Sequence, residues 1–209
     1  MATPGALRES FVGRGDSFGL LDRWFAEAAD GASRLVVVRG EAGIGKTRLA
    51  RRWLAGSQVR DARLLIGAAH EDVLTPFLPL AAALDGLPGL GDVFTWTPRA
   101  EDGDRAELSL FLAVTRALMA AASRRPTVLM IDDVQWADQS TIELLSHLVA
   151  TATHVASARL FVLLTERIGA GTKRVQAALR RPESEPIHRG VIPPCLDQNE
   201  GHQLVPLRG

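Results

Sequence analysis

Eight consecutive residues combine glycines, one lysine and one threonine in the order Gly40-Glu41-Ala42-Gly43-Ile44-Gly45-Lys46-Thr47. This segment, here called the phosphate loop, fits the pattern G-x-x-x-x-G-K-[ST] at every fixed position. Glycines let the backbone curl with its N–H groups turned inward, a lysine ammonium suits the β- and γ-phosphates, and a threonine hydroxyl suits Mg²⁺. The loop therefore predicts a site for ATP and Mg²⁺. A chance glycine-rich turn is the alternative.

A second acidic feature follows four apolar residues, 128–131, that run directly into Asp132 and Asp133. A buried strand that ends in carboxylates delivers them to the carboxyl edge of a parallel sheet, where ligands bind in open α/β folds. We expect Asp132 to hold Mg²⁺ through water, because Mg²⁺ keeps several waters in proteins. We expect Asp133 to orient or polarise an attacking water. The alternative is a pair of surface acids that cap a turn before the helix near Ser140.

The pattern of apolar residues predicts the helices and strands that must position these groups. A strand must precede the phosphate loop and a helix must follow it, and residues 35–38 and 46–55 meet both demands. We expect further strands at 64–66, 127–131 and 160–164, with a fifth starting near Ile187. Further helices are expected at about 16–29, 77–84, 104–123, 138–152 and 172–179. This alternation predicts an α/β fold with a parallel sheet and helices on both faces.

Composition narrows the class of protein. Across 209 residues the net charge is zero, with 46% hydrophobic and 23% charged residues, so no nucleic-acid or membrane partner is expected. We find no signal peptide and no apolar run near the ~20 residues that cross a bilayer, which predicts a cytoplasmic protein. The lone cysteine, Cys195, excludes an intrachain disulfide. The histidines lack metal-ligand spacing. Only two of the 24 basic residues are lysines. The presence of one of them, Lys46, inside the glycine-rich loop therefore strengthens the prediction of a phosphate site.

Residues 40–47 (GEAGIGKT) and residues 128–138 (VLMIDDVQWAD) together resemble the AAA-related ATPase domain of STAND-type signalling ATPases. The resemblance is to the ATPase module of large bacterial LuxR-type transcriptional regulators, and it spans about residues 10–168. It implies a three-layer P-loop NTPase fold with sheet order 5-1-4-3-2. The strand at 160–164 would then lie between the phosphate-loop strand and the aspartate strand.

The resemblance also implies roles for residues outside the two central motifs. Phe11-Val12-Gly13-Arg14 is similar to an entry motif that lies by the adenine, which makes Val12, Gly13 and Arg14 nucleotide-binding candidates. Leu163-Leu164-Thr165-Glu166-Arg167 resembles the sensor strand, where Thr165 and Arg167 would read the γ-phosphate. The alternatives are an ordinary exposed arginine at position 14 and a plain strand end at 165–167. Trp136 could belong to the site or pack in the core, and both alternatives stay open. Asp138 is expected to cap the next helix.

We expect three segments: a flexible N-terminus at 1–10, an ATPase core at 11–181, and an irregular stretch at 182–209. Proteins of the family continue into a helical lid and often a DNA-binding helix-turn-helix, so the chain reads as a truncated or minimal form. The first hypothesis is a slow, regulatory ATPase in which Lys46, Arg167 and Mg²⁺ stabilise the transferred phosphoryl group. The alternative is a non-hydrolysing nucleotide-binding interaction module or a fragment of a larger regulator. Partners would be ATP or ADP, further copies, or domains of a longer regulator, without direct nucleic-acid contact.

Overall fold

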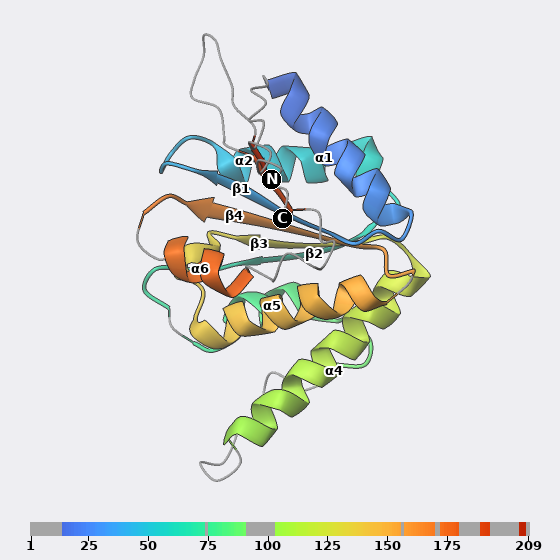
Figure 1. The fold of residues 1–209 in the computed structure, drawn as a ribbon, viewed down its shortest axis with the longest axis vertical. Coiled ribbons are helices and arrows are strands. Elements are labelled where there is room, and N and C mark those ends of the chain that lie inside the picture. Colours follow the sequence, from blue (N-terminus) through green and yellow to red (C-terminus); the bar gives the residue numbers. More distant parts are fainter. Residues whose placement is uncertain are drawn as a thin grey trace, which may run out of the picture.

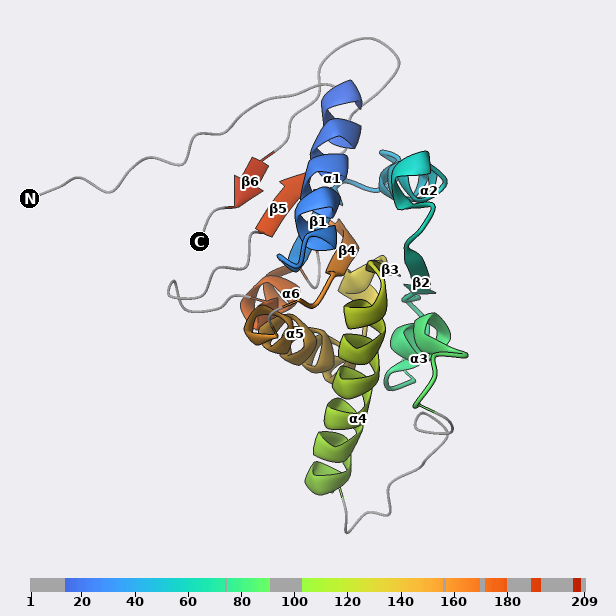
Figure 2. The same cartoon turned by 90° about the vertical axis from the view of Figure 1, so that its right-hand side faces the viewer.

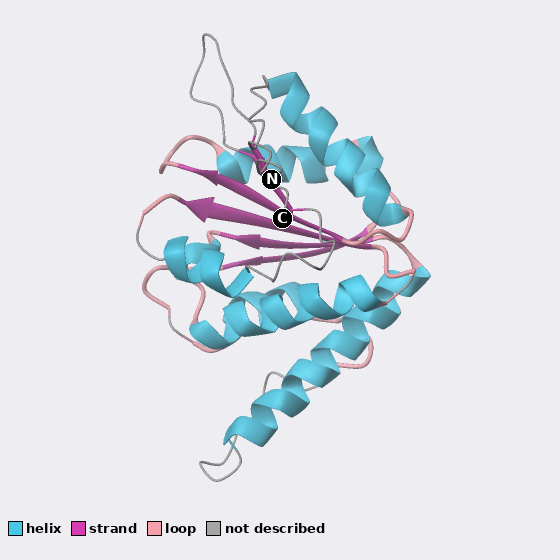
Figure 3. Ribbon diagram, in the orientation of Figure 1, coloured by secondary structure: helices cyan, strands magenta, loops and turns pink. Residues whose placement is uncertain are grey.

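The computed structural model describes residues 14–73, 75–90, 103–155, 157–169, 172–179, 189–192 and 205–207. They form one sheet with helices on both of its faces (Figures 1 and 3). Six strands lie in the order β2-β3-β4-β1-β5-β6. The strands are β1 (Arg34–Gly40), β2 (Arg63–Ala68), β3 (Thr127–Asp132), β4 (Leu160–Arg167), β5 (Arg189–Ile192) and β6 (Val205–Leu207). The predicted order 5-1-4-3-2 is confirmed, with β6 added antiparallel to β5.

The parallel register brings the functional strand ends to one edge of the sheet. Strand β1 pairs with β4 from Arg34 opposite Phe161 to Gly40 opposite Arg167. On its other edge, β4 pairs with β3, and every residue of β3 is buried. Because all three strands run the same way, Gly40, Asp132 and Arg167 meet at the carboxyl edge. This is the edge at which ligands bind in α/β sheets.

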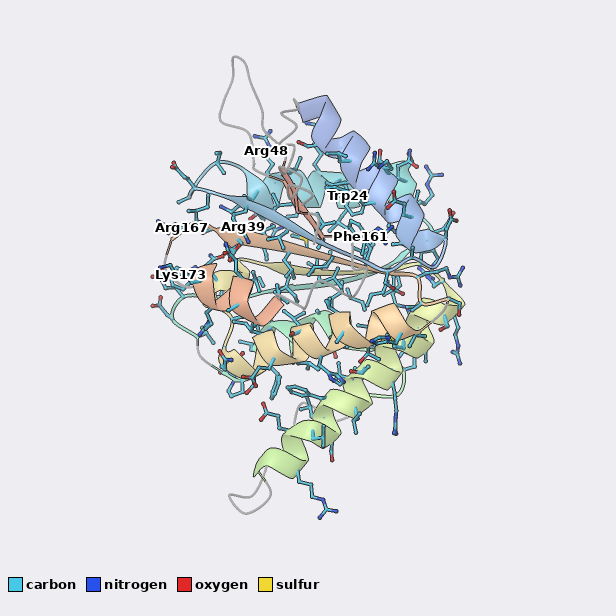
Figure 4. The ribbon with its side chains drawn as sticks, viewed as in Figure 1. Trp24, Arg39, Arg48, Phe161, Arg167 and Lys173 are labelled. Carbon is cyan, nitrogen blue, oxygen red and sulfur yellow. The ribbon has the colours of Figure 1, made fainter. Side chains whose placement is uncertain are left out.

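Helices α1 (Arg14–Ala29) and α2 (Lys46–Leu54) cover one face of the sheet. Their core contains an aromatic cluster in which Trp53 of α2 lies 5.8 Å from Phe25 and 5.3 Å from Phe161, centroid to centroid. The indole Nε1 of Trp53 donates to Asp22 Oδ1 at 2.8 Å, so its polar atom is satisfied although the ring is buried. Figure 4 labels Phe161 on the sheet beneath α1. The cluster fixes α2, whose first residue is Lys46.

Among the described residues, four helices lie on the opposite face: α3 (Leu78–Leu84), α4 (Gly103–Arg124), α5 (Gln139–His154) and α6 (Thr172–Leu179). Asp138 caps α5, as predicted, because its Oδ1 accepts from the Thr141 backbone N–H at 2.9 Å. Ser146 of α5 donates to the carbonyl of Ala178 in α6 at 2.6 Å. Trp136 is partly buried against this core, which favours the packing interpretation over a place in the site.

Helix α4 requires a correction to the sequence analysis. Within the described residues, its stretch Arg105–Arg124 is long and apolar enough, by length and composition, to cross a membrane. Core helices pass the same test. In the second half of α4, Leu118 and Ala122 are fully buried in the core, whereas Leu108 and Leu112 in the first half are exposed. The first half projects from the body of the domain (Figures 1 and 2). The burial of its second half is that of a core helix.

The predicted helices and strands are present, and several extend beyond their predicted ends. Strand β4 continues through Arg167, three residues past the predicted end, because its pairing with β1 persists to Gly40. Strands β5 and β6 lie within 182–209, the stretch we expected to be irregular. The division of the chain into segments stays a prediction. Positions 1–13 and 91–102, Cys195, His188 and His202 lie outside the described residues.

Strand β2 and α3 approach each other so closely that only glycine fits at position 67. A Cβ on Gly67 would lie 1.9 Å from the Pro79 carbonyl oxygen and 3.2 Å from the Ala83 Cβ. We expect Gly67→Ala to lower the free energy of unfolding by roughly 1–3 kcal/mol, because α3 must shift. Gly19→Ala is the control, since a Cβ on this helical glycine meets nothing within 4 Å and should stabilise by about 0.5–1 kcal/mol. Denaturant unfolding measures both, and equal effects would contradict the packing account.

Candidate nucleotide-binding site

The phosphate loop forms the bend between β1 and α2. Gly43 and Gly45 have φ angles of +75° and +96°, which side chains rarely adopt, so the bend depends on glycine at both positions. The Lys46 side chain is buried within the loop, where Nζ donates to the carbonyls of Gly40 at 3.1 Å and Glu41 at 2.8 Å. The loop therefore holds an ammonium in its bend, beside the N-terminus of α2. Both features favour an anion.

The surroundings of Lys46 disfavour its charge in the free protein. Burial lowers the pKa of Lys46 below its ordinary value. Asp133 and Asp132 oppose this shift, and the nearby Arg167 adds to it. A phosphate chain bound in the loop would supply negative charge next to Lys46 and would raise its pKa again. The burial of this lysine therefore favours an anionic ligand.

Two threonine hydroxyls, from α2 and β4, meet at one carboxylate oxygen at the end of β3. Asp132 Oδ1 accepts a hydrogen bond from Thr47 Oγ1 at 2.9 Å and another from Thr165 Oγ1 at 2.5 Å. Its second oxygen lies 3.9 Å from Nη2 of the exposed Arg51, which is a loose ion pair. A threonine hydroxyl beside a carboxylate is a hard oxygen donor set, which fits Mg²⁺. The structure thus brings together Thr47, Asp132 and Thr165, whose roles stay predictions.

Asp133 adopts a backbone conformation that is uncommon for a non-glycine residue, with φ at +53°. Its backbone N–H donates to Thr165 Oγ1 at 2.8 Å, and its Oδ1 accepts from Gln135 Nε2 at 3.1 Å. Asp133 is half-buried and lies directly after the last residue of β3. Left-handed backbone at such a position is typical of functional sites.

Arg167 lies at the end of β4, opposite Gly40 of the phosphate loop (Figure 4). Its charge contributes to the lowered pKa of Lys46, and its role toward a nucleotide stays a prediction. Arg14 is the first residue of α1, but its side chain lies outside the described residues, as do Val12 and Gly13 entirely. The predicted adenine contact therefore stays a prediction.

Sequence reasoning missed Gln135, which lies in the short helix η2 (Val134–Trp136) directly after the two aspartates. Its side chain is 3% exposed and hydrogen-bonds at both ends, to Asp133 and to the backbone of Arg167. The available signal was its place inside the VQWAD segment, two residues after Asp133. Spacing alone could not show which way the amide points.

A buried ion pair lies on the reverse face of the same strand ends. Glu166 is fully buried, and its Oε2 accepts from Arg39 Nε at 2.5 Å, while its Oε1 has no partner among the described residues. Burial raises the pKa of Glu166 above its ordinary value of 4.5, although Arg39 opposes the shift. The pair joins the residue before Gly40 to the residue between Thr165 and Arg167.

The raised pKa of Glu166 predicts how stability depends on pH. A carboxyl that binds its proton more tightly when folded stabilises the protein below the unfolded value of 4.5. That contribution is lost as pH rises through the folded pKa. We therefore expect Glu166→Gln to gain stability relative to the wild type as pH rises from about 4.5. Denaturant unfolding over a pH series measures this difference, and a gain by the wild type instead would mean that Arg39 outweighs burial.

The glycine-rich bend, the buried ammonium and the threonine–aspartate contact define a P-loop nucleotide-binding site. Comparison with protein families agrees, because residues 10–163 match the AAA ATPase domain. The chain belongs to the AAA ATPase domain family. It is a nucleotide-binding module of the AAA type.

Individual relatives are distant. An uncharacterized protein of Rhizobium meliloti (strain 1021) is 24% identical over 83% of this chain, which spans 20% of that protein's length. The crystal structure of Cdc6p from Pyrobaculum aerophilum has a TM-score of 0.53 and 12% identity, covering 90% of this chain and 47% of that one. The AAA domain of FIGL-1 in complex with ADP has a TM-score of 0.44 and 13% identity, covering 84% and 56%. The likeness to Cdc6p shows the fold.

Proposed function

We propose that the domain binds ATP with Mg²⁺ and hydrolyses it slowly, as the switch of a larger signalling or transcription-regulating protein. The observation that carries the proposal is the contact of Thr47 Oγ1 with Asp132 Oδ1 at 2.9 Å, next to the buried ammonium of Lys46. Hydroxyl, carboxylate and ammonium are the three groups that a triphosphate and its metal require at one place.

Each residue has a distinct part in the proposed reaction. Lys46 exchanges its two carbonyl partners for oxygens of the β- and γ-phosphates. Thr47 and Asp132 hold Mg²⁺, which would neutralise charge on the phosphates when bound. Asp133 accepts a hydrogen bond from the attacking water and orients it. Arg167 stabilises the charge that develops on the γ-phosphoryl group.

A switch needs a group that responds to the γ-phosphate and is coupled to the rest of the fold. Thr165 is coupled to both aspartates, because its hydroxyl donates to Asp132 and accepts from the backbone N–H of Asp133, and this supports it as the group that would respond. Loss of the γ-phosphate would redistribute these hydrogen bonds along β4. Together with the resemblance of residues 128–138 and 163–167 to STAND-type ATPases, this favours a regulatory timer over a metabolic catalyst.

Phosphate release from ATP, measured beside ATP binding, tests the proposal. The wild type is expected to bind ATP and release phosphate slowly, whereas Lys46→Ala is expected to bind ATP much more weakly and to release no phosphate. Binding without release would favour the alternative, a non-hydrolysing interaction module. Release that persists in Lys46→Ala would contradict the assignment of the phosphate loop.

A further inference from the structure

The side chain of Gln135 connects the candidate catalytic acid to the sensor strand. Its Nε2 donates to Asp133 Oδ1 at 3.1 Å, and its Oε1 accepts from the Arg167 backbone N–H at 2.9 Å. The residue is 3% exposed, so water does not compete for either bond. A buried amide with both ends occupied holds one orientation.

The short helix that carries Gln135 is held from the other side by α6. Arg174 Nη2 donates to the carbonyl of Ala137 and makes a longer contact, 3.5 Å, with the carbonyl of Gln135. Val134 is fully buried in the core beside this helix. The backbone of η2 is therefore fixed by contacts that do not involve the side-chain amide of Gln135. The amide does not hold η2 in place, and it can hydrogen-bond Asp133.

The conformation of Asp133 also depends on contacts with neighbouring residues. With its φ at +53°, the residue sits in a sparsely populated conformation, and its carboxylate lies outside the regular strand. Thr165 holds its N–H, but among the described contacts only Gln135 holds its carboxylate. A bond to Oδ1 fixes one oxygen and leaves Oδ2 for a water.

We propose that Gln135 is a positioning residue for hydrolysis: it orients the Asp133 carboxylate toward the attacking water and couples it to the end of β4. The inference rests on the proposed function, because it assumes that Asp133 acts on water. Gln135 itself touches neither nucleotide nor water.

An amide is the group that this position requires. Its NH₂ group offers a donor to the carboxylate and its carbonyl oxygen offers an acceptor to the N–H, on two separate atoms, whereas a hydroxyl carries both functions on one atom. Glutamate keeps the acceptor toward Arg167 but faces Asp133 with a second carboxylate, which repels it. Leucine removes both hydrogen bonds at similar size. Gln135→Leu therefore tests the loss of both hydrogen bonds. Gln135→Glu tests the replacement of the donor toward Asp133 by a repelling carboxylate.

The test compares kcat for ATP hydrolysis, the Kd for ATP and the thermal midpoint in Gln135→Leu and Gln135→Glu. Loss of a hydrogen bond to a charged group predicts a fall in kcat of about 10- to 100-fold in Gln135→Leu. Gln135→Glu should be at least as slow. The Kd for ATP should stay within about threefold, since the bridge contacts no phosphate. Gln139→Leu is the matched control, because this exposed glutamine is hydrogen-bonded to Glu143 on the surface of α5 and should leave all three values unchanged.

A double-variant cycle separates positioning from a merely structural role. If Gln135 acts through Asp133, Gln135→Leu should not slow Asp133→Ala any further. Wild-type kcat in both Gln135 variants, or a further fall in the double variant, would overturn the inference alone. If Gln135→Leu does not fold, Gln135→Glu decides by the same comparison. Absence of Lys46-dependent turnover in the wild type would overturn the proposed function, and the inference with it.

Discussion

Lys46→Ala is expected to weaken ATP binding by about 100-fold, the largest effect on affinity of any single change in the domain. Charged hydrogen bonds contribute roughly 1.5–3 kcal/mol each, and the ammonium would make more than one to the phosphates. The alanine also removes the hydrogen bonds that Nζ donates to the carbonyls of Gly40 and Glu41. Fluorescence or calorimetric titration with ATP and Mg²⁺ measures the Kd.

The sequence supplies a matched control for this experiment. The only other lysine is Lys173, which is exposed on α6. Lys173→Ala removes the same charge from the chain and should leave the Kd within about twofold, because exposed charges contribute little. Equal weakening in both variants would show that net charge, and not the phosphate loop, governs the binding.

Asp133→Asn is expected to reduce kcat by about 10²- to 10⁴-fold while ATP binding is kept, because a general base contributes that much. The amide preserves the size of the side chain and can still accept from Gln135, so the geometry at Oδ1 is retained. What is lost is the basic oxygen that accepts from water. Single-turnover phosphate release and the Kd for ATP are measured on the same preparation.

Asp61→Asn serves as the control for charge, since Asp61 is exposed in the turn before β2. It should hydrolyse ATP at the wild-type rate. If Asp133→Asn also kept wild-type turnover, another group would have to activate the water, and the Asp133 assignment would be wrong. If Asp133→Asn lost ATP binding as well, Asp133 would be assigned to the Mg²⁺ site and not to the activation of water.

The sequence predicted those parts of the site that depend on local chemistry. Glycines at 43 and 45 with Lys46 and Thr47 describe one continuous bend, and an apolar strand ending in Asp132 has one place to deliver its carboxylate. Both expectations concern residues that act within a few positions of each other. The sheet order required the family resemblance, because periodicity shows that strands exist but not which of them are neighbours.

The missed features depend on contacts between distant residues. The Gln135 bridge spans 32 positions to Arg167, and the Arg39–Glu166 pair spans 127. Neither residue type signals such a partner by itself, since glutamine and arginine are mostly exposed in proteins. The close approach of Gly67 to Pro79 is likewise invisible until α3 is placed against β2. Such contacts follow from the register of the strands, which the sequence pattern leaves open.

Calorimetric titration of the folded protein with ATP, in the presence of Mg²⁺ and again with the metal chelated, tests the central claim most directly. The account predicts saturating heat at one nucleotide per chain with Mg²⁺, and weaker binding when the metal is removed or Thr47 is replaced by valine. No heat at millimolar ATP from protein with a cooperative unfolding transition would contradict it.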